Sequence, residues 1–132
     1  MSPLALRWVR FNAVGALGVV VQLAAFGLLF SLLRLNYMPA AGLAVEAAVL
    51  HNFVWHERFT WRERPVQSPR GLSGRLLRFH AGNGLVSIAG NLALMRALIG
   101  GMHLDHYLAA GISIAMCSGL NFALSEWFVF RA

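Results

Sequence analysis

The chain has 132 residues, of which 58% are hydrophobic and 12% are charged. Soluble domains are about 45–50% apolar and about 25% charged, so this composition excludes a typical water-soluble globule, and also a disordered chain. All eleven basic residues are Arg, against five acidic residues, and they lie between long apolar runs, which favours a membrane charge bias over nucleic-acid binding. The single cysteine excludes an internal disulfide and leaves too few soft ligands for a thiolate zinc site.

Four apolar stretches are long enough to cross a membrane as helices. A helix rises about 1.5 Å per residue, so about 20 residues cross the hydrocarbon core. The sequence predicts spans at residues 11–33, 37–55, 79–99 and 107–130. Gln22 is the only strongly polar side chain in the first span. The third is interrupted by polar side chains, namely His80, Asn83, Asn91 and Arg96.

The charged residues predict the orientation of these spans. Nine of the eleven Arg lie on one side, near the two termini and in an Arg-rich loop at about residues 56–78. By the positive-inside rule this side is cytoplasmic, so both termini are expected in the cytoplasm. The Trp residues fall on the same side, whereas Tyr37 and Tyr107 begin the second and fourth spans on the other. We therefore expect a multi-pass protein of the cytoplasmic (inner) membrane.

The two halves of the chain resemble each other. The segment NFVWHERFTWR (52–62) matches NFALSEWFVFR (121–131) at a spacing of 69 residues, and the Arg-Phe pair at 10–11 matches the pair at 78–79 at a spacing of 68. One residue was therefore gained or lost inside the repeated unit. A unit with two crossings starts and ends on the same side, so its copy has parallel topology. The predicted fold is an all-α membrane protein, a single domain of residues 1–132 whose four transmembrane helices form two parallel two-helix repeats.

Glu46 is the most unusual residue inside a span. It lies about 14 Å into the second span, near the middle of the bilayer, where an acid costs about 2.5–3.5 kcal/mol and usually faces a cavity or a partner. Its repeat counterpart is Ala115, so building the fold does not require an acid at this position. We interpret Glu46 either as a proton or headgroup site or as a neutral, hydrogen-bonded residue that packs helices.

Other polar residues gather toward the cytoplasmic half of the spans. Together with nearby Arg they resemble an anion-binding entrance, because guanidinium groups bind phosphate bidentately. Interhelical hydrogen bonds and attraction of Arg to anionic lipids are the plainer alternatives. The candidate residues for binding a phosphate or sugar headgroup are Arg10, Glu46, His51, Asn52, Arg78, Asn83 and Asn121.

The chain shows no pattern typical of an enzyme. It contains no nucleophile beside a base, no glycine-rich phosphate loop and no paired-carboxylate site. His103, Asp105 and His106 cluster in the second outer loop, but a metal site would need a fourth ligand. We therefore predict no enzymatic activity, no catalytic residue, no metal site and no cofactor.

Four short motifs recur at the ends of the predicted spans. They are RFNAVGALG, NFVWHERFTW, RFHAGNG and NFALSEWFVF. With this pattern the chain resembles the GtrA-like family of small four-span membrane proteins over nearly its whole length. The resemblance implies a role in cell-surface polysaccharide synthesis, in which a polyprenyl-phosphate-linked sugar is flipped to the outer leaflet, often beside a membrane glycosyltransferase. Glu57 and Glu126 depart from the pattern, which weakens any phosphate-binding role at these two positions.

Two other functions stay open at this point. A scaffold subunit would position a glycosyltransferase through the Arg-rich loop. A small proton-coupled multidrug exporter would use Glu46, although proteins of that kind carry their Glu in the first span. Four short helices scarcely enclose a sugar-sized cavity, so we expect a homodimer or higher oligomer in contact with membrane lipids, held together at faces of small residues.

Overall fold

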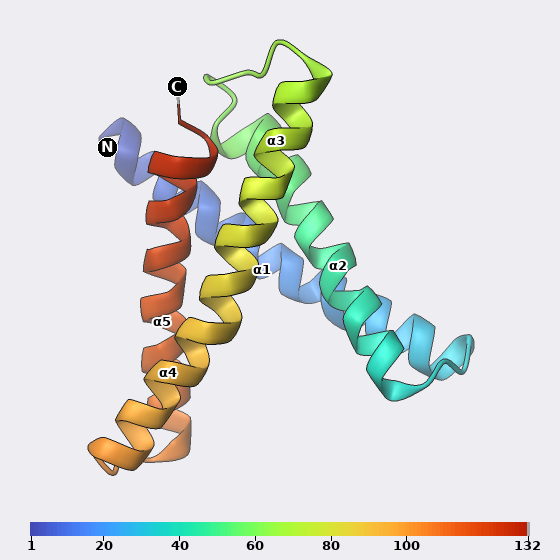
Figure 1. The fold of residues 1–132 in the computed structure, drawn as a ribbon, viewed down its shortest axis with the longest axis vertical. Coiled ribbons are helices and arrows are strands. Elements are labelled where there is room, and N and C mark those ends of the chain that lie inside the picture. Colours follow the sequence, from blue (N-terminus) through green and yellow to red (C-terminus); the bar gives the residue numbers. More distant parts are fainter. Residues whose placement is uncertain (132) are drawn as a thin grey trace. The chain divides into compact units, whose positions relative to one another are not determined.

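The computed structural model describes residues 1–131, and these residues form helices and short connections without any strand. The predicted all-α class is confirmed. The chain folds into two compact units, Met1–Pro65 (unit 1) and Val66–Ala132 (unit 2). Each unit contains a hairpin of two long helical stretches (Figure 1).

Unit 1 is built from two helices that each end in a π-helical turn. In chain order these are α1 (Pro3–Gly27), η1 (Leu28–Leu32), α2 (Tyr37–Trp55) and η2 (His56–Thr60). The side chain of Ser2 caps the start of α1 by accepting a hydrogen bond from the backbone N–H of Ala5 at 3.1 Å.

Small residues bring the two helices of unit 1 close together. Ala40, Ala44 and Ala48 recur every four residues on the buried face of α2, and α1 packs against this helix. A side chain at Gly18 of α1 would collide with the amide of Asn52, so glycine makes room for this polar group. Close backbone approach through small residues is a common way to hold helices together in lipid.

Unit 2 begins with a helical stretch, Pro69–Gly101, of 33 residues. A second stretch follows it after a short turn. The elements in chain order are α3 (Pro69–Phe79), η3 (His80–Gly84), η4 (Val86–Gly90), α4 (Asn91–Met95), η5 (Arg96–Gly101), α5 (His106–Leu124) and η6 (Ser125–Val129).

The second helix of each hairpin has the same bounds at a constant offset. α5 and η6 begin and end 69 residues after α2 and η2. The turns before them each contain one residue with a left-handed backbone, Arg34 at φ 53° and His103 at φ 55°, again 69 positions apart. The local chain path at these turns and helix ends is therefore the same in both units.

Matched contacts also locate the one-residue difference between the first helices. Phe11 and Phe79, 68 positions apart, occupy corresponding aromatic contacts, whereas Gly18 and Ser87, 69 positions apart, both lie against an Asn of the second helix. The extra residue of unit 2 therefore falls between 79 and 87. This interval contains η3, where backbone hydrogen bonds span five residues, so the wider turn takes up one more residue.

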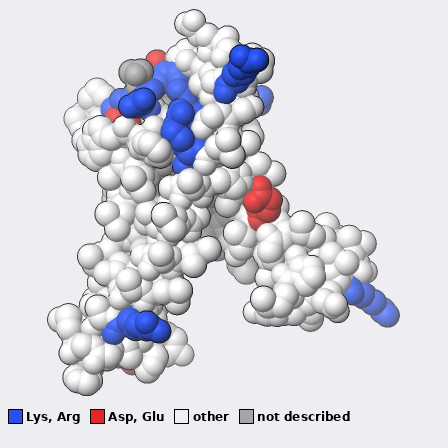
Figure 2. Space-filling model, viewed as in Figure 1, with Lys and Arg blue, Asp and Glu red and all other residues white. Residues whose placement is uncertain are grey.

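Three helical stretches are long and apolar enough to cross a membrane, namely Pro3–Leu32, Pro69–Gly101 and His106–Val129. The helix predicted at residues 37–55 is present as α2 but is not among them. It carries Glu46, His51 and Asn52, which lower its mean hydropathy. Figure 2 shows that charged side chains are sparse on the visible face of the molecule, as expected for a membrane protein.

The polar loop predicted at residues 56–78 is shorter than expected. η2 and α3 occupy its two ends, so only residues 61–68 are non-helical. The hydroxyl of Ser68 accepts a hydrogen bond from the backbone N–H of Gly71 at 3.1 Å, and Pro69 follows this cap as the first helical residue. This is a favourable helix start, which is why α3 begins ten residues before the predicted span at 79.

Candidate functional site

The end of α2 is enclosed by a compact cluster, which we call the helix-end cluster of unit 1. It consists of Phe11, His56, Thr60 and Trp61. The ring of Phe11 stacks on His56 with centroids 4.8 Å apart and meets Trp61 edge-on at 6.1 Å. The imidazole Nδ1 of His56 lies 3.0 Å from the hydroxyl of Thr60. His56, Thr60 and Trp61 are at most 2% exposed, so every polar group here is held inside the unit.

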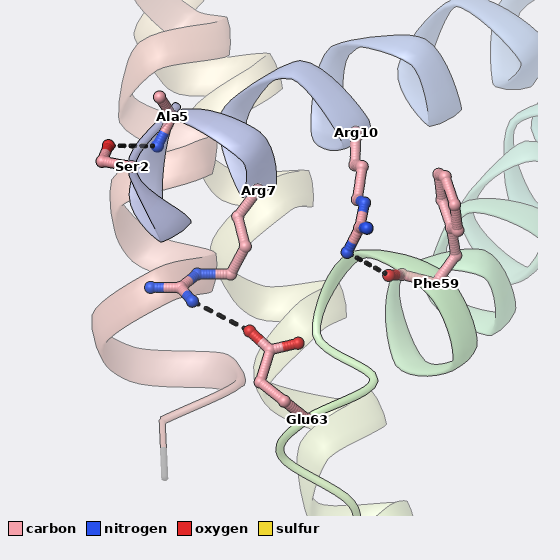
Figure 3. Close-up of polar contacts among 6 residues, drawn as sticks. All are labelled: Ser2, Ala5, Arg7, Arg10, Phe59 and Glu63. Atoms are coloured by element: carbon pink, nitrogen blue, oxygen red, sulfur yellow. Dashed lines mark hydrogen bonds and ion pairs between the residues drawn. The ribbon is translucent and has the colours of Figure 1, made fainter.

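Two arginine side chains from α1 make contacts that stabilise the same region. The guanidinium of Arg10 lies 5.0 Å from the ring centre of Phe59, and its Nη1 donates to the Phe59 carbonyl at 3.4 Å (Figure 3). A cation at this position complements the unsatisfied carbonyls at a helix C-terminus. Arg7 forms an ion pair with Glu63 at 2.8 Å, which ties the connection 61–68 to α1. These contacts give both arginines a structural role.

Burial changes the proton affinity of His56, which lies just past the predicted span of residues 37–55. Burial, with a smaller contribution from nearby His51, lowers the pKa of His56 to about 3 from the ordinary 6.5. His56 is therefore neutral at physiological pH and serves as a packed aromatic and hydrogen-bonding group.

Unit 2 has a corresponding helix-end cluster, formed by Arg78, Phe79, Ser125 and Phe130. Phe79 meets Phe130 edge-on with centroids 6.1 Å apart, as Phe11 meets Trp61 in unit 1. Arg78 donates through Nη2 to the carbonyl of Val129 at 3.4 Å. The guanidinium of Arg75 lies 5.2 Å from the ring centre of Phe130, and Arg75 is buried.

The two units differ in their buried polar atoms. The buried side-chain atoms of unit 2 that have no hydrogen-bond partner among residues 1–131 include Arg78 Nε, Ser113 Oγ, Asn121 Oδ1 and Ser125 Oγ. The matching residues of unit 1 lie 69 positions earlier. Asn52, which matches Asn121, has its Oδ1 3.1 Å from the imidazole of His51, and His56, which matches Ser125, pairs with Thr60. Ala44, which matches Ser113, is apolar. An unsatisfied buried polar group costs about 1–3 kcal/mol, so these atoms of unit 2 carry a cost that no partner within residues 1–131 offsets.

The structure distributes the seven predicted headgroup residues over both units. Arg10, Glu46, His51 and Asn52 belong to unit 1, and Arg78, Asn83 and Asn121 belong to unit 2. Of these, it brings His51 and Asn52 into contact. Glu46 is exposed and, by helical spacing, lies on the face of α2 opposite Ala44 and Ala48.

Two serines, Ser87 and Ser125, belong to the same set of polar residues in unit 2. The amide Nδ2 of Asn121 donates to the hydroxyl of Ser87 at 3.3 Å, while Ser125 is fully buried in η6. Sequence reasoning missed both serines. The repeat spacing could have pointed to them, because Ser87 lies 69 residues after Gly18 and Ser125 lies 69 residues after His56. Asn83 is half-buried in η3.

Asp105, in the turn of unit 2, forms hydrogen bonds with backbone groups. The carboxylate of Asp105 caps α5 by accepting hydrogen bonds from the backbone N–H groups of Tyr107 and Leu108 at 3.0 and 3.2 Å. Within residues 1–131, no three His, Cys, Asp or Glu side chains are grouped so that they could hold a metal ion.

The chain matches the model of a known protein family over most of its length. The family model described as the GtrA/DPMS transmembrane domain matches residues 10–130, which include both helix-end clusters. No curated protein matches the chain.

Proposed function

Because the chain belongs to the GtrA/DPMS transmembrane-domain family, whose members handle lipid-linked sugars in membranes, we propose that it flips a polyprenyl-phosphate-linked sugar across the cytoplasmic membrane for cell-surface polysaccharide synthesis or modification. The observation that carries this proposal is the extent of the match, residues 10–130, which covers most of both units. The product would be the same lipid-linked sugar in the outer leaflet. No covalent step is involved, so the protein acts without catalytic residues.

The proposed topology has four spans with both termini in the cytoplasm. Supporting it, nine of the eleven Arg lie on one side of the predicted spans. The constant offset of 69 residues between α2 and α5 supports a duplication of one hairpin. Each copy would contribute two crossings, with α2 as the fourth span although its polar residues reduce its hydropathy. A homodimer or higher oligomer would provide a larger wall around the sugar.

Unit 2 is suited to receive the headgroup. During flipping, the isoprenoid tail stays in the hydrocarbon while the phosphate and sugar need polar partners, because a charge inside the bilayer is costly. Arg78 offers a cation at the cytoplasmic end, and Asn121 and Ser125 offer buried oxygens that have no hydrogen-bond partner in the part of the chain that the structure describes. The predicted headgroup residues of unit 1, Arg10, His51 and Asn52, already make contacts within that unit, so we assign the headgroup to unit 2.

A reconstituted translocation assay tests the proposal. A radiolabelled polyprenyl-phosphate sugar is placed in proteoliposomes that contain only this protein, and a membrane-impermeant oxidant reports the fraction of sugar exposed outside. We expect exposure that depends on the protein and is abolished by Glu46→Gln, which removes the intramembrane acid. Unchanged transport in Glu46→Gln would assign this residue to helix packing. Absence of flux from folded protein over a panel of sugars would contradict flipping.

A scaffold role is the second candidate, favoured by the exposed arginines around the connection 61–68. Arg58, Arg62 and Arg70 are all exposed and would suit docking of a glycosyltransferase. Replacing these three by Gln should release the enzyme in co-purification if the protein is a scaffold, and should leave flux in proteoliposomes intact if it is a flippase. Deleting the connection 61–68 together with the residues that follow it would be less informative than these substitutions, since the deletion would remove the start of α3.

A further inference from the structure

An apolar hollow that contains one arginine lies on the long helical stretch of unit 2. It has a volume of about 680 Å³, and its lining includes Ala89, Leu92, Ala93, Arg96, Ile99 and Gly100. By helical spacing, residues 89, 93, 96 and 100 share one face. The small side chains lower this face, while Leu92 and Ile99 border it on one side by the same spacing. The volume lies within the range of about 300–1,000 Å³ typical of small-ligand sites.

Arg96 is not required by the hairpin itself. Its matched position in unit 1, 69 residues earlier, is Gly27, and both units nonetheless form the same turn. Arg96 is exposed, and it lies within the helical stretch Pro69–Gly101 that is long and apolar enough to cross a membrane. An ionisable residue in such a segment usually marks a functional site, because it is costly to place there.

The spacing of two arginines sets the depth of the hollow. Arg78 and Arg96 are 18 residues apart on the same helical stretch. At the α-helical rise of about 1.5 Å per residue this is at most about 27 Å, close to the roughly 30 Å thickness of the hydrocarbon core. With Arg78 at the cytoplasmic interface, Arg96 reaches the outer interface. Ala89, Leu92 and Ala93 then lie deeper, in the hydrocarbon of the outer leaflet.

We propose that the hollow binds the flipped lipid, with Arg96 on the phosphate of the polyprenyl-phosphate sugar and the first isoprene units against Ala89, Leu92 and Ala93. This site rests on the proposed function and adds an outer-leaflet station to it. The guanidinium matches a phosphate in charge and in fork geometry. A hollow along one helix face suits the single chain of an isoprenoid lipid better than the two chains of a phospholipid.

Photo-crosslinking of the full chain in lipid nanodiscs tests the site directly. The probe is a short isoprenyl phosphate that carries a diazirine on its first isoprene unit, with the phosphate-free isoprenol as its partner. Arg96→Gln removes the charge, and Ala93→Leu fills the hollow while keeping the charge. The matched controls are Ala24→Leu, at the corresponding exposed position of unit 1, and Arg34→Gln, an exposed arginine of the first turn.

We expect labelling by the phosphate probe to fall about tenfold in Arg96→Gln and Ala93→Leu and to stay within about twofold of the parent in both controls. The isoprenol should label all of them equally and weakly. Circular dichroism and size-exclusion profiles confirm that the variants fold. Equal labelling of all variants by the phosphate probe would overturn the site, and so would competition by phosphatidylglycerol as strong as by unlabelled isoprenyl phosphate.

The labelling result is independent of translocation. If the labelling pattern appears in a protein that transports nothing, the lipid-phosphate site stands and flipping fails. If the parent protein flips the lipid and Arg96→Gln neither loses labelling nor slows flux, the site fails and flipping stands.

Discussion

The helix-end clusters of the two units share a framework and differ in their polar content. In both, an arginine from the first helix donates to a carbonyl at the end of the second, and an aromatic ring of the first helix meets a buried ring beyond that end. In unit 1 the remaining polar groups pair with each other, as His56 does with Thr60. In unit 2 the corresponding Ser125 is buried, and its hydroxyl has no hydrogen-bond partner among the described residues 1–131.

This difference separates what the hairpin needs from what it can vary. The arginine and the two rings are present in both units, so they are the parts that hold a helix end in place. The residue at position 56 or 125 varies from an imidazole that fills the cluster to a small hydroxyl that does not. Unit 1 thereby gains a closed end, and unit 2 retains hydrogen-bonding capacity. The variants below test this division.

The shared rings should give the largest effects on stability. Trp61 and Phe130 are fully buried, at 0% exposure. Truncation of a buried Trp or Phe to Ala costs about 3–5 kcal/mol because it removes contacts and leaves a cavity. We therefore expect Trp61→Ala and Phe130→Ala each to lower the free energy of unfolding by an amount in this range, measured by reversible denaturation in mixed micelles. A small loss in only one of the two would show that the units are not equivalent here.

The second-largest effect is expected in the pH dependence of stability, to which the helix-end cluster of unit 1 should contribute and that of unit 2 should not. The pKa of His56 is about 3 in the folded protein and 6.5 when unfolded, so the unfolded chain binds the proton more tightly. The stabilising effect of neutral His56 is complete above about pH 6.5 and is lost as the pH falls toward 3. At about pH 5 the loss is about 2 kcal/mol, since 1.5 pH units lie below the unfolded pKa.

The control for this prediction keeps the size of the side chain but removes its titration. His56→Gln should be less stable near neutrality and should lose most of the pH dependence between about pH 7 and pH 5. Ser125 in unit 2 does not titrate in this range and gives unit 2 no comparable term. A slope that persists in His56→Gln would assign the pH dependence to another group.

Much of this framework could be predicted from the sequence, because it is carried by spacing. The motif match at 69 residues gives the common end of α2 and α5, and the change to 68 indicates an extra residue in unit 2. The apolar runs give the long helices. Spacing works here because a helix converts sequence distance directly into face and depth.

Other features could not be predicted, because they depend on individual atoms. The segment before residue 79 contains Pro, Gly and Arg and was predicted as a loop, yet Ser68 and Pro69 start a helix there. Asn52 and Asn121 look identical in the two motifs, but the oxygen of Asn52 lies beside an imidazole, whereas the oxygen of Asn121 has no hydrogen-bond partner among the residues that the structure describes. Spacing places a side chain on a face without showing which of its atoms finds a partner.

The matched arginines should separate stability from transport. Arg10 lies over Phe59, so Arg10→Gln removes a cation–π contact and a long hydrogen bond and should cost about 1 kcal/mol of stability with little change in flux. Within residues 1–131 the buried Nε of Arg78 has no hydrogen-bond partner, so Arg78→Gln should reduce flux by about tenfold, which corresponds to about 1.4 kcal/mol. Comparable losses of flux in both variants would show that both units bind the headgroup.

The smallest effect is expected at the ion pair of unit 1. Arg7 and Glu63 have side-chain exposures of 14% and 46%, so water and salt screen their attraction, and Glu63→Gln should cost about 0.2–1 kcal/mol. Arg75, which lies 68 residues after Arg7, is buried beside Phe130, so Arg75→Gln should cost more than Glu63→Gln. Arg62→Gln, at an exposed position of the same connection, is the control.

Salt separates these two cases. Raising the ionic strength should remove most of the difference between the parent protein and Glu63→Gln, because exposed pairs are screened within about a Debye length. It should leave the cost of Arg75→Gln nearly unchanged, since a buried guanidinium is shielded from ions. If both costs fell equally with salt, Arg75 would act as a surface charge, and the contrast between the two units would be limited to their hydrogen-bonding groups.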